Sequence, residues 1–77
     1  MVIKLKMIND VKDFCKKSSE FNGNVDVLSG RFAVSGESIM GLFALDLSLP
    51  ITVLAKSDNK DKQAENEFYE SIKKYVS

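Results

Sequence analysis

The N-terminal segment alternates between polar and apolar side chains. From Val2 to Ile8, lysines occupy alternate positions, and Ile3, Leu5 and Met7 lie between them. A period of two residues is typical of a strand that has one face in water and the other in the core. We therefore expect a first strand over Val2–Ile8.

A helical pattern follows at once. Asn9 or Asp10 is suited to the N-cap, because a short polar side chain can accept a bond from a free backbone N–H. The positions expected on the inner face are Val11, Phe14, Cys15, Ser18 and Phe21. The positions expected on the solvated face are Lys12, Asp13, Lys16, Lys17 and Glu20. Asn22-Gly23-Asn24 then ends the helix, with Gly23 suited to a left-handed C-terminal position.

Two β-rich runs follow this helix. Val25–Leu28 and Arg31–Val34 are separated by Ser29-Gly30, a pair typical of a two-residue hairpin. Arg31, the only arginine of the chain, is either a solvated residue of this hairpin or an anchor for an acidic partner.

The middle of the chain predicts a short helix and a further strand. The Ser35–Ser38 segment offers two serine caps for a helix over Ile39–Asp46. Pro50 precedes a strand over Ile51–Lys56, where a missing N–H does little harm. Ser57–Asp61 is polar and rich in capping residues, so it predicts the start of another helix.

The last helix carries apolar side chains on one stripe and ends with two lysines. The stripe consists of Ala64, Phe68, Ile72, Tyr75 and Val76. Lys73 and Lys74 lie near the negative end of the helix dipole. The element order is β-α-β-β-α-β-α, which predicts an α+β open-faced sandwich: a four-stranded antiparallel sheet with three helices on one face. The whole chain, 1–77, is expected to form a single domain.

Composition limits the class of function. Eleven basic residues balance eleven acidic ones, so the chain lacks the positive surface of a nucleic-acid-binding protein and has little attraction for anionic membranes. No apolar run approaches the ~20 residues of a membrane span, and no signal peptide is evident. The only cysteine, Cys15, has no internal disulfide partner. These features predict a soluble, cytoplasmic protein.

The segment Ser38–Leu45 resembles the regulatory-serine segment of HPr, the phosphocarrier of the bacterial sugar phosphotransferase system. In that family a serine followed by Ile-Met-Gly opens a short helix after the central hairpin, and the same residues stand here in the same topological place. The element order is also similar to that of the family from end to end. The resemblance implies an HPr-like open-faced β-sandwich, a phosphorylatable Ser38 and a docking surface on the short helix.

Two departures from the family pattern matter. The family's phosphorylated histidine lies between the first strand and the first helix, but here Ile8–Val11 passes directly from one to the other. The chain contains no histidine, so a phosphorelay through a histidine is excluded by composition. The connection Asp46–Pro50 is also about two residues shorter than is usual for the family.

The candidate functional residues lie around the short helix. Ser38 is either a plain helix cap or a cap that a serine kinase phosphorylates, and Glu37 beside it is unfavourable for an added phosphate. At 100° per residue, Leu42 and Leu45 point away from the other apolar residues of this helix, which predicts an exposed apolar patch. The expected partner-binding residues are Ile39, Met40 and Phe43, together with Lys16 and Lys17, which the resemblance implies would face an acidic partner. The alternative is that one or two of the apolar residues pack under the Asp46–Pro50 loop and that the two lysines are ordinary solvated surface.

The leading hypothesis is a regulatory, protein-docking module. The alternatives are an accessory carrier loaded on Cys15 or on a serine, and a relic of the fold with an unrelated role. Cys15 itself is expected to be a buried, inert thiol, because the chain has no histidine to activate it. The sequence shows no paired catalytic carboxylates, no phosphate loop and no metal-ligand cluster, so we expect no enzyme activity, no cofactor and no metal.

Overall fold

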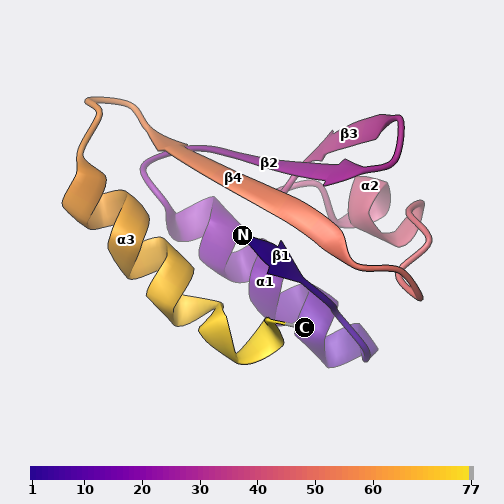
Figure 1. Ribbon diagram of the computed structural model, residues 1–77. Coiled ribbons are helices and arrows are strands. Elements are labelled where there is room, and N and C mark those ends of the chain that lie inside the picture. The colour runs from indigo at the N-terminus through magenta and orange to yellow at the C-terminus, as the bar shows by residue number, and fades with distance from the viewer. Residues whose placement is uncertain (77) are drawn as a thin grey trace.

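The computed structural model describes residues 1–76 as one open sheet with helices against one of its faces (Figure 1). The strands are β1 (Val2–Ile3), β2 (Gly23–Ser29), β3 (Phe32–Ser35) and β4 (Ile51–Ser57). The helices are α1 (Ile8–Glu20), α2 (Ile39–Phe43), α3 (Lys62–Ser71) and the 3-10 turn η1 (Lys73–Tyr75). The predicted α+β class and the element order are confirmed.

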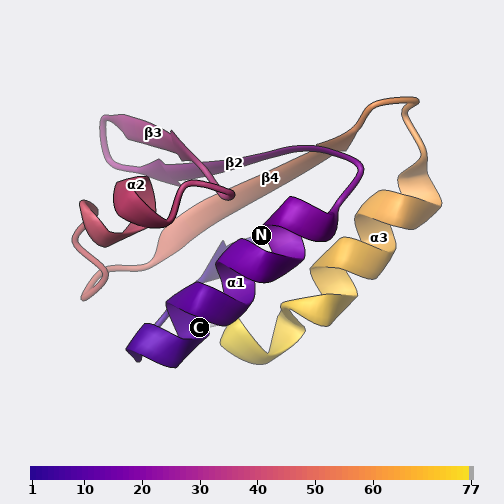
Figure 2. The same cartoon turned by 180° about the vertical axis from the view of Figure 1, so that it is seen from behind.

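The sheet has four strands in the order β1-β4-β2-β3, and every neighbouring pair is antiparallel. Val27 of β2 pairs with Val53 of β4 on one side and with Val34 of β3 on the other. In Figures 1 and 2, α1 and α3 lie side by side under the sheet, and α2 lies under the β2–β3 hairpin. The three helices therefore share one face of the sheet, as the sequence predicts.

The core lies between the inner face of the sheet and the helices. In β4 the side chains of Ile51, Val53 and Ala55 are buried, while those of Leu54 and Lys56 are exposed. The other buried apolar residues are Ile3, Leu5, Val11, Phe14, Val25, Val27, Leu42, Phe68 and Ile72. The inward-facing side chains of the strands and the apolar stripes of the helices thus pack together in a single cluster.

The first strand is much shorter than predicted. Only Val2 and Ile3 pair with β4, and the next amide, that of Lys4, donates to the carbonyl oxygen of Tyr75 at 2.8 Å. The alternation still holds as far as Leu5, which is buried. The extended backbone therefore continues beyond the strand, but the C-terminal segment takes over its hydrogen bonding.

The prediction for the start of the first helix was wrong by two or three residues. The helix begins at Ile8, with Met7 as the residue before it, and not after Asn9 or Asp10. The carboxylate of Asp10 instead accepts the backbone N–H groups of Lys6, at 3.3 Å, and Met7, at 3.2 Å. A carboxylate in the first turn can reach back to free amides in this way, so the polar residue caps the helix from inside it.

Two glycines and the last helix also differ from prediction. Gly23 is the first residue of β2 and not part of the end of α1. The hairpin turn is Gly30-Arg31, because Ser29 still pairs with Phe32, and Gly30 takes the positive φ of 59°. The last helix ends at Ser71, and η1 follows it with a tighter winding. Arg31 is therefore a turn residue, exposed at the tip of the hairpin.

The third helix begins as its sequence indicates. The Asp61 carboxylate accepts the backbone N–H groups of Gln63, at 3.0 Å, and Ala64, at 3.2 Å. None of the helices formed by residues 1–76 has the length and apolar character that are needed to span a membrane.

Candidate functional site

Ser38 is the N-cap of α2. Its backbone is extended, and its Oγ accepts a hydrogen bond from the N–H of Gly41 at 3.1 Å. Ser35, the other serine considered, accepts the N–H of Glu37 at 3.2 Å, within the preceding turn. The structure thus selects Ser38 as the cap, and it leaves the residue exposed to solvent.

The short helix α2 has one buried side and one exposed side. Leu42 is completely buried, whereas the side chain of Met40 is 79% exposed and that of Phe43 is 44% exposed. Ile39 is half-buried and packs against the edge of the core. The predicted apolar patch therefore exists at Met40 and Phe43, and Ile39 contributes less to it than expected. The helix itself ends at Phe43, three residues before the predicted Asp46.

A groove extends this patch towards the start of α1. It has a volume of about 460 Å³ and lies between the β1–α1 connection and the end of α2 with the loop that follows it. Its apolar lining consists of Leu5, Met7, Ile8, Val11, Phe43 and Leu47. Met7 is 69% exposed and Ile8 is 64% exposed, so both present apolar surface to solvent. The rim also carries Lys4 and Lys6.

Sequence reasoning missed Met7, Ile8 and Leu47 as site residues. Met7 and Ile8 were assigned to a strand, so Met7 was expected in the core, whereas the chain has already turned into α1 at that point. The signal available in the sequence was the absence of an inserted loop between Leu5 and Val11. Without such a loop, the beginning of the helix stands open beside α2.

The loop after α2 has its own internal hydrogen bonds. The Asp46 carboxylate accepts the N–H of Ser48 at 3.1 Å and also its hydroxyl group. The hydroxyl bond, with the backbone bond added to it, holds the pKa of Asp46 below its ordinary value of 3.8. Leu47 between these two residues is half-buried and forms one wall of the groove.

The site offers a binding surface. It has no imidazole that could carry a phosphoryl group, because the chain has no histidine. Among residues 1–76 no three histidine, cysteine, aspartate or glutamate side chains gather as metal ligands would. What the groove can do chemically is take up apolar side chains beside two ammonium groups.

Cys15 is only half-buried, so the prediction of a buried thiol was not accurate. Its Sγ donates to the carbonyl oxygen of Glu37 at 3.3 Å, which places the thiol against the turn that leads into Ser38. Nearby, a Cβ on Gly36 would approach the Ser18 Oγ to 2.7 Å. The absence of a side chain at Gly36 therefore permits α1 to pack closely against this turn.

The two lysines expected at a partner interface lie in different surroundings. Lys16 is exposed on the outer side of α1. Lys17 is half-buried, and its ammonium group bonds to the Asp13 carboxylate and to the carbonyl oxygen of Ser71, each at 3.0 Å. The expectation that Lys17 belongs to the solvated side of the helix was therefore wrong, because Lys17 ties α1 to the end of α3.

Asp13 is the centre of a polar cluster that joins α1 to the C-terminal turn. Its Oδ2 accepts the Tyr75 hydroxyl at 2.6 Å and the Lys17 ammonium at 3.0 Å, and the Lys74 ammonium lies at 3.5 Å. The Tyr75 bond, followed by that of Lys17, lowers the pKa of Asp13 from 3.8 to about 2. Burial, followed by the hydrogen bond to this carboxylate, raises the pKa of Tyr75 above its ordinary value.

We expect this cluster to make stability depend on pH in the acid range. The folded-state pKa of Asp13, about 2, is below the ordinary 3.8, so its contribution is complete above about pH 4 and is lost as the pH falls towards 2. Because this side chain is 33% exposed, screening limits the contribution to on the order of 1 kcal/mol. Urea unfolding at several pH values between 2 and 6 measures it. Asp13→Asn should lose stability above pH 4 and show a weaker pH dependence, and an unchanged dependence would contradict this assignment.

The architecture defines the class of protein: the chain has the HPr-like fold. No protein-family model matches the sequence, and no curated protein matches it either. Among solved structures it is similar to HPr-C-His from Thermoanaerobacter tengcongensis, with a TM-score of 0.73 and 21% identity over 95% of this chain and 89% of that one. It is also similar to the catabolite repression protein Crh of Bacillus subtilis, a swapped-domain dimer, with a TM-score of 0.66 and 18% identity over 97% of this chain and 87% of that one. At these identities the likeness establishes the fold.

Proposed function

We propose that this protein is a docking module and not an enzyme, and that it binds a protein partner through α2 and the start of α1. The observation that carries the proposal is the exposure of Met7, Ile8 and Phe43 around one apolar groove, with Met40 exposed on the same short helix as Phe43. A cytoplasmic location fits the single cysteine. The likeness of the fold to HPr and Crh favours a regulator or a component of the phosphotransferase system as the partner.

Exposed apolar side chains on α2 and at the start of α1 lose favourable burial unless a partner covers them. Large apolar side chains that stand together in water are typical of surfaces that a partner covers. Met7 and Met40 have flexible, polarizable side chains, which can adapt to the shape of a partner. Lys4 and Lys6 add positive charge at the rim of the groove and complement an acidic partner, to which the exposed Lys16 of α1 could add. The residues thus combine an apolar centre with a charged margin, as protein interfaces do.

Phosphorylation of Ser38 is the proposed means of control. The hydroxyl is exposed, and its oxygen already accepts a bond from the Gly41 N–H, a role that a phosphate oxygen can continue. The exposed Glu37 opposes the new charge from one side, so a partner that supplies Arg or Lys would gain most from the modification. The phosphate would stand at the beginning of the helix whose other end borders the groove.

Incubation with ATP and an HPr serine kinase should add one phosphate to the protein. Intact-mass spectrometry measures the product, and HPr serves as a competent substrate in parallel. Ser38→Ala should remain unmodified, while Ser35→Ala, which changes the neighbouring serine of the preceding turn, should still be phosphorylated. If HPr is labelled and this protein is not, Ser38 is a helix cap only.

Met40→Asp should weaken partner capture without unfolding the domain. Met40 is largely exposed, so the new charge changes the folding free energy little, but it stands on α2 within the proposed interface. We expect at least a tenfold weaker complex in pull-down and cross-linking from cell extract. Ala33→Asp is the matched control, because it places the same charge at an exposed position of β3 outside the groove.

The unfolding transition of each variant shows whether a loss of partner capture comes from the interface or from a damaged fold. Equal loss of capture with Met40→Asp and Ala33→Asp would contradict the docking surface. Loss of cooperative unfolding in Met40→Asp would show that Met40 belongs to the core.

A further inference from the structure

The strand β4 is longer than the strand that covers its outer edge. β1 pairs only Val2 with Thr52 and Ile3 with Ile51, and Met1 exchanges hydrogen bonds with Val53 at 2.7 and 3.0 Å. Beyond Val53, the residues Leu54–Ser57 pair with β2 on one side. On the other side, no strand formed by residues 1–76 accompanies them (Figure 1).

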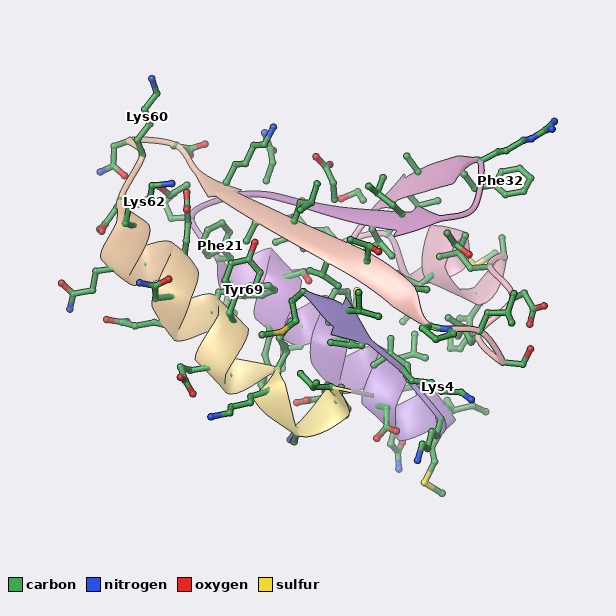
Figure 3. All side chains as sticks on the ribbon, in the orientation of Figure 1. Lys4, Phe21, Phe32, Lys60, Lys62 and Tyr69 are labelled. Carbon is green, nitrogen blue, oxygen red and sulfur yellow. The ribbon has the colours of Figure 1, made fainter. Side chains whose placement is uncertain are left out.

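Side chains of α3 occupy the backbone donors of this uncovered edge. The Ala55 N–H donates to the Tyr69 hydroxyl oxygen at 2.8 Å, and the Ser57 N–H donates to the Glu65 carboxylate at 3.0 Å. Figure 3 shows Tyr69 extending from α3 towards β4. The N–H and C=O groups of Val53 both bond to Met1, on the β1 side of β4. In an antiparallel ladder every second residue directs these groups to the same side, so the N–H groups of Ala55 and Ser57 also point to the β1 side. The two oxygens therefore stand where the carbonyl oxygens of a longer β1 would stand.

An open hollow accompanies this edge. It has a volume of about 680 Å³, and its walls come from β4, from the loop that follows it and from α3. Lys56 and Lys60 border the hollow from the side of β4 and its loop, and Asn66 and Tyr69 border it from α3. The hollow thus lies along the part of β4 that β1 does not pair with.

We propose that Leu54–Ser57 is a strand-addition site for one extended peptide segment of a partner. Tyr69 and Glu65 accept the N–H groups of this edge in the free protein, and the bound segment displaces them. A peptide strand supplies carbonyl oxygens to the same N–H groups and takes up the free edge, which is a common mode of peptide recognition. The site is continuous with the existing β1–β4 ladder, so its register is known in advance. A second copy of this chain fits less well, because α3 walls the hollow and a second α3 would have to enter it.

The register defines the chemistry of the segment. The residue opposite Ala55 faces the helices and must be small, since Ala55 and the Tyr69 side chain already fill that side. The residues opposite Leu54 and Lys56 lie on the open face of the sheet. An apolar side chain suits the position opposite Leu54, and an acidic one suits the position opposite Lys56. The preferred segment is therefore extended, with an acidic, a small and an apolar residue in succession.

A four-residue extension of the 77-residue chain tests this proposal. The segment Thr-Glu-Ala-Val, added before Met1, would continue β1 and place Ala opposite Ala55 and Glu opposite Lys56. The matched control is Thr-Glu-Pro-Val, because Pro at the third position removes the N–H that the Ala55 carbonyl would accept. Amide hydrogen exchange measured by NMR reports the Ala55 and Ser57 N–H groups directly. The measurement uses the Tyr69→Phe background, in which Ala55 has lost its side-chain acceptor.

We expect Tyr69→Phe to speed exchange at Ala55 and the Thr-Glu-Ala-Val extension to slow it again by at least tenfold relative to the Pro control. Replacing Glu by Lys in the extension should reduce the protection. Tyr75→Phe, which removes the other tyrosine hydroxyl, should leave Ala55 unchanged. If Ala55 exchanges as fast with the Thr-Glu-Ala-Val extension as without any extension, in a variant that unfolds cooperatively, the proposal is overturned, and Tyr69 and Glu65 protect an edge that takes no strand.

Discussion

Gly23→Ala is expected to lower the free energy of unfolding by about 3 kcal/mol or more. Gly23 begins β2 with φ at +157°, and a Cβ there would overlap the carbonyl oxygen of Lys56 and approach the Ser57 Cα to 2.7 Å. These are backbone atoms of the neighbouring strand, so they cannot move aside without separating β2 from β4. Urea unfolding followed by circular dichroism measures the loss.

Gly30→Ala is the control for this substitution. Gly30 also has a positive φ, +59°, but no heavy atom lies within 4 Å of the position of its missing Cβ. The cost there is that of the left-handed backbone alone, about 1 kcal/mol. Similar losses in the two variants would show that contact with β4 is not what requires Gly23.

Leu42→Ala should destabilise the protein by about 3 kcal/mol, whereas Met40→Ala should change its stability by less than about 0.5 kcal/mol. Both residues belong to the five-residue helix α2, but Leu42 is buried in the core and Met40 is exposed. Removing Leu42 leaves a cavity under the hairpin, because the sheet above it is held by its own ladder and cannot collapse onto α2.

The comparison uses the same denaturation experiment for both variants. A small loss for Leu42→Ala would mean that α2 is only loosely attached to the sheet. A large loss of stability for Met40→Ala would mean that Met40 packs against the protein itself. Met40 would then not be available to the proposed docking surface.

Local patterns were sufficient for most of the fold. The alternation of Lys4 with Ile3 and Leu5 predicted an extended segment with one buried face, because a strand presents successive side chains to opposite sides, and Ile3 and Leu5 are buried. The opposite directions of Leu42 and Met40 on α2 followed from helical geometry in the same way. The helix ends were less predictable, since residues such as Asp10 can cap from more than one position.

The candidate site was only partly predictable. Ser38 and the exposed apolar side of α2 follow from a short segment whose own geometry exposes them. Met7 and Ile8 join them only because the chain leaves the sheet after Ile3 and brings the start of α1 beside the end of α2. Lys17 leaves the predicted solvated face of α1 for a similar reason, since the end of α3 supplies a carbonyl oxygen within its reach.

The sequence by itself determined the α+β order of elements, the apolar faces and the absence of any histidine, because these depend on residue identity and on spacings of a few positions. Only the tertiary structure decided which surfaces these elements form together. The groove, the Asp13 cluster and the Tyr69 and Glu65 contacts to β4 each join residues from segments that are separate in sequence. Such contacts depend on where the C-terminal segment and α3 lie relative to the sheet, and no local period along the chain carries that information.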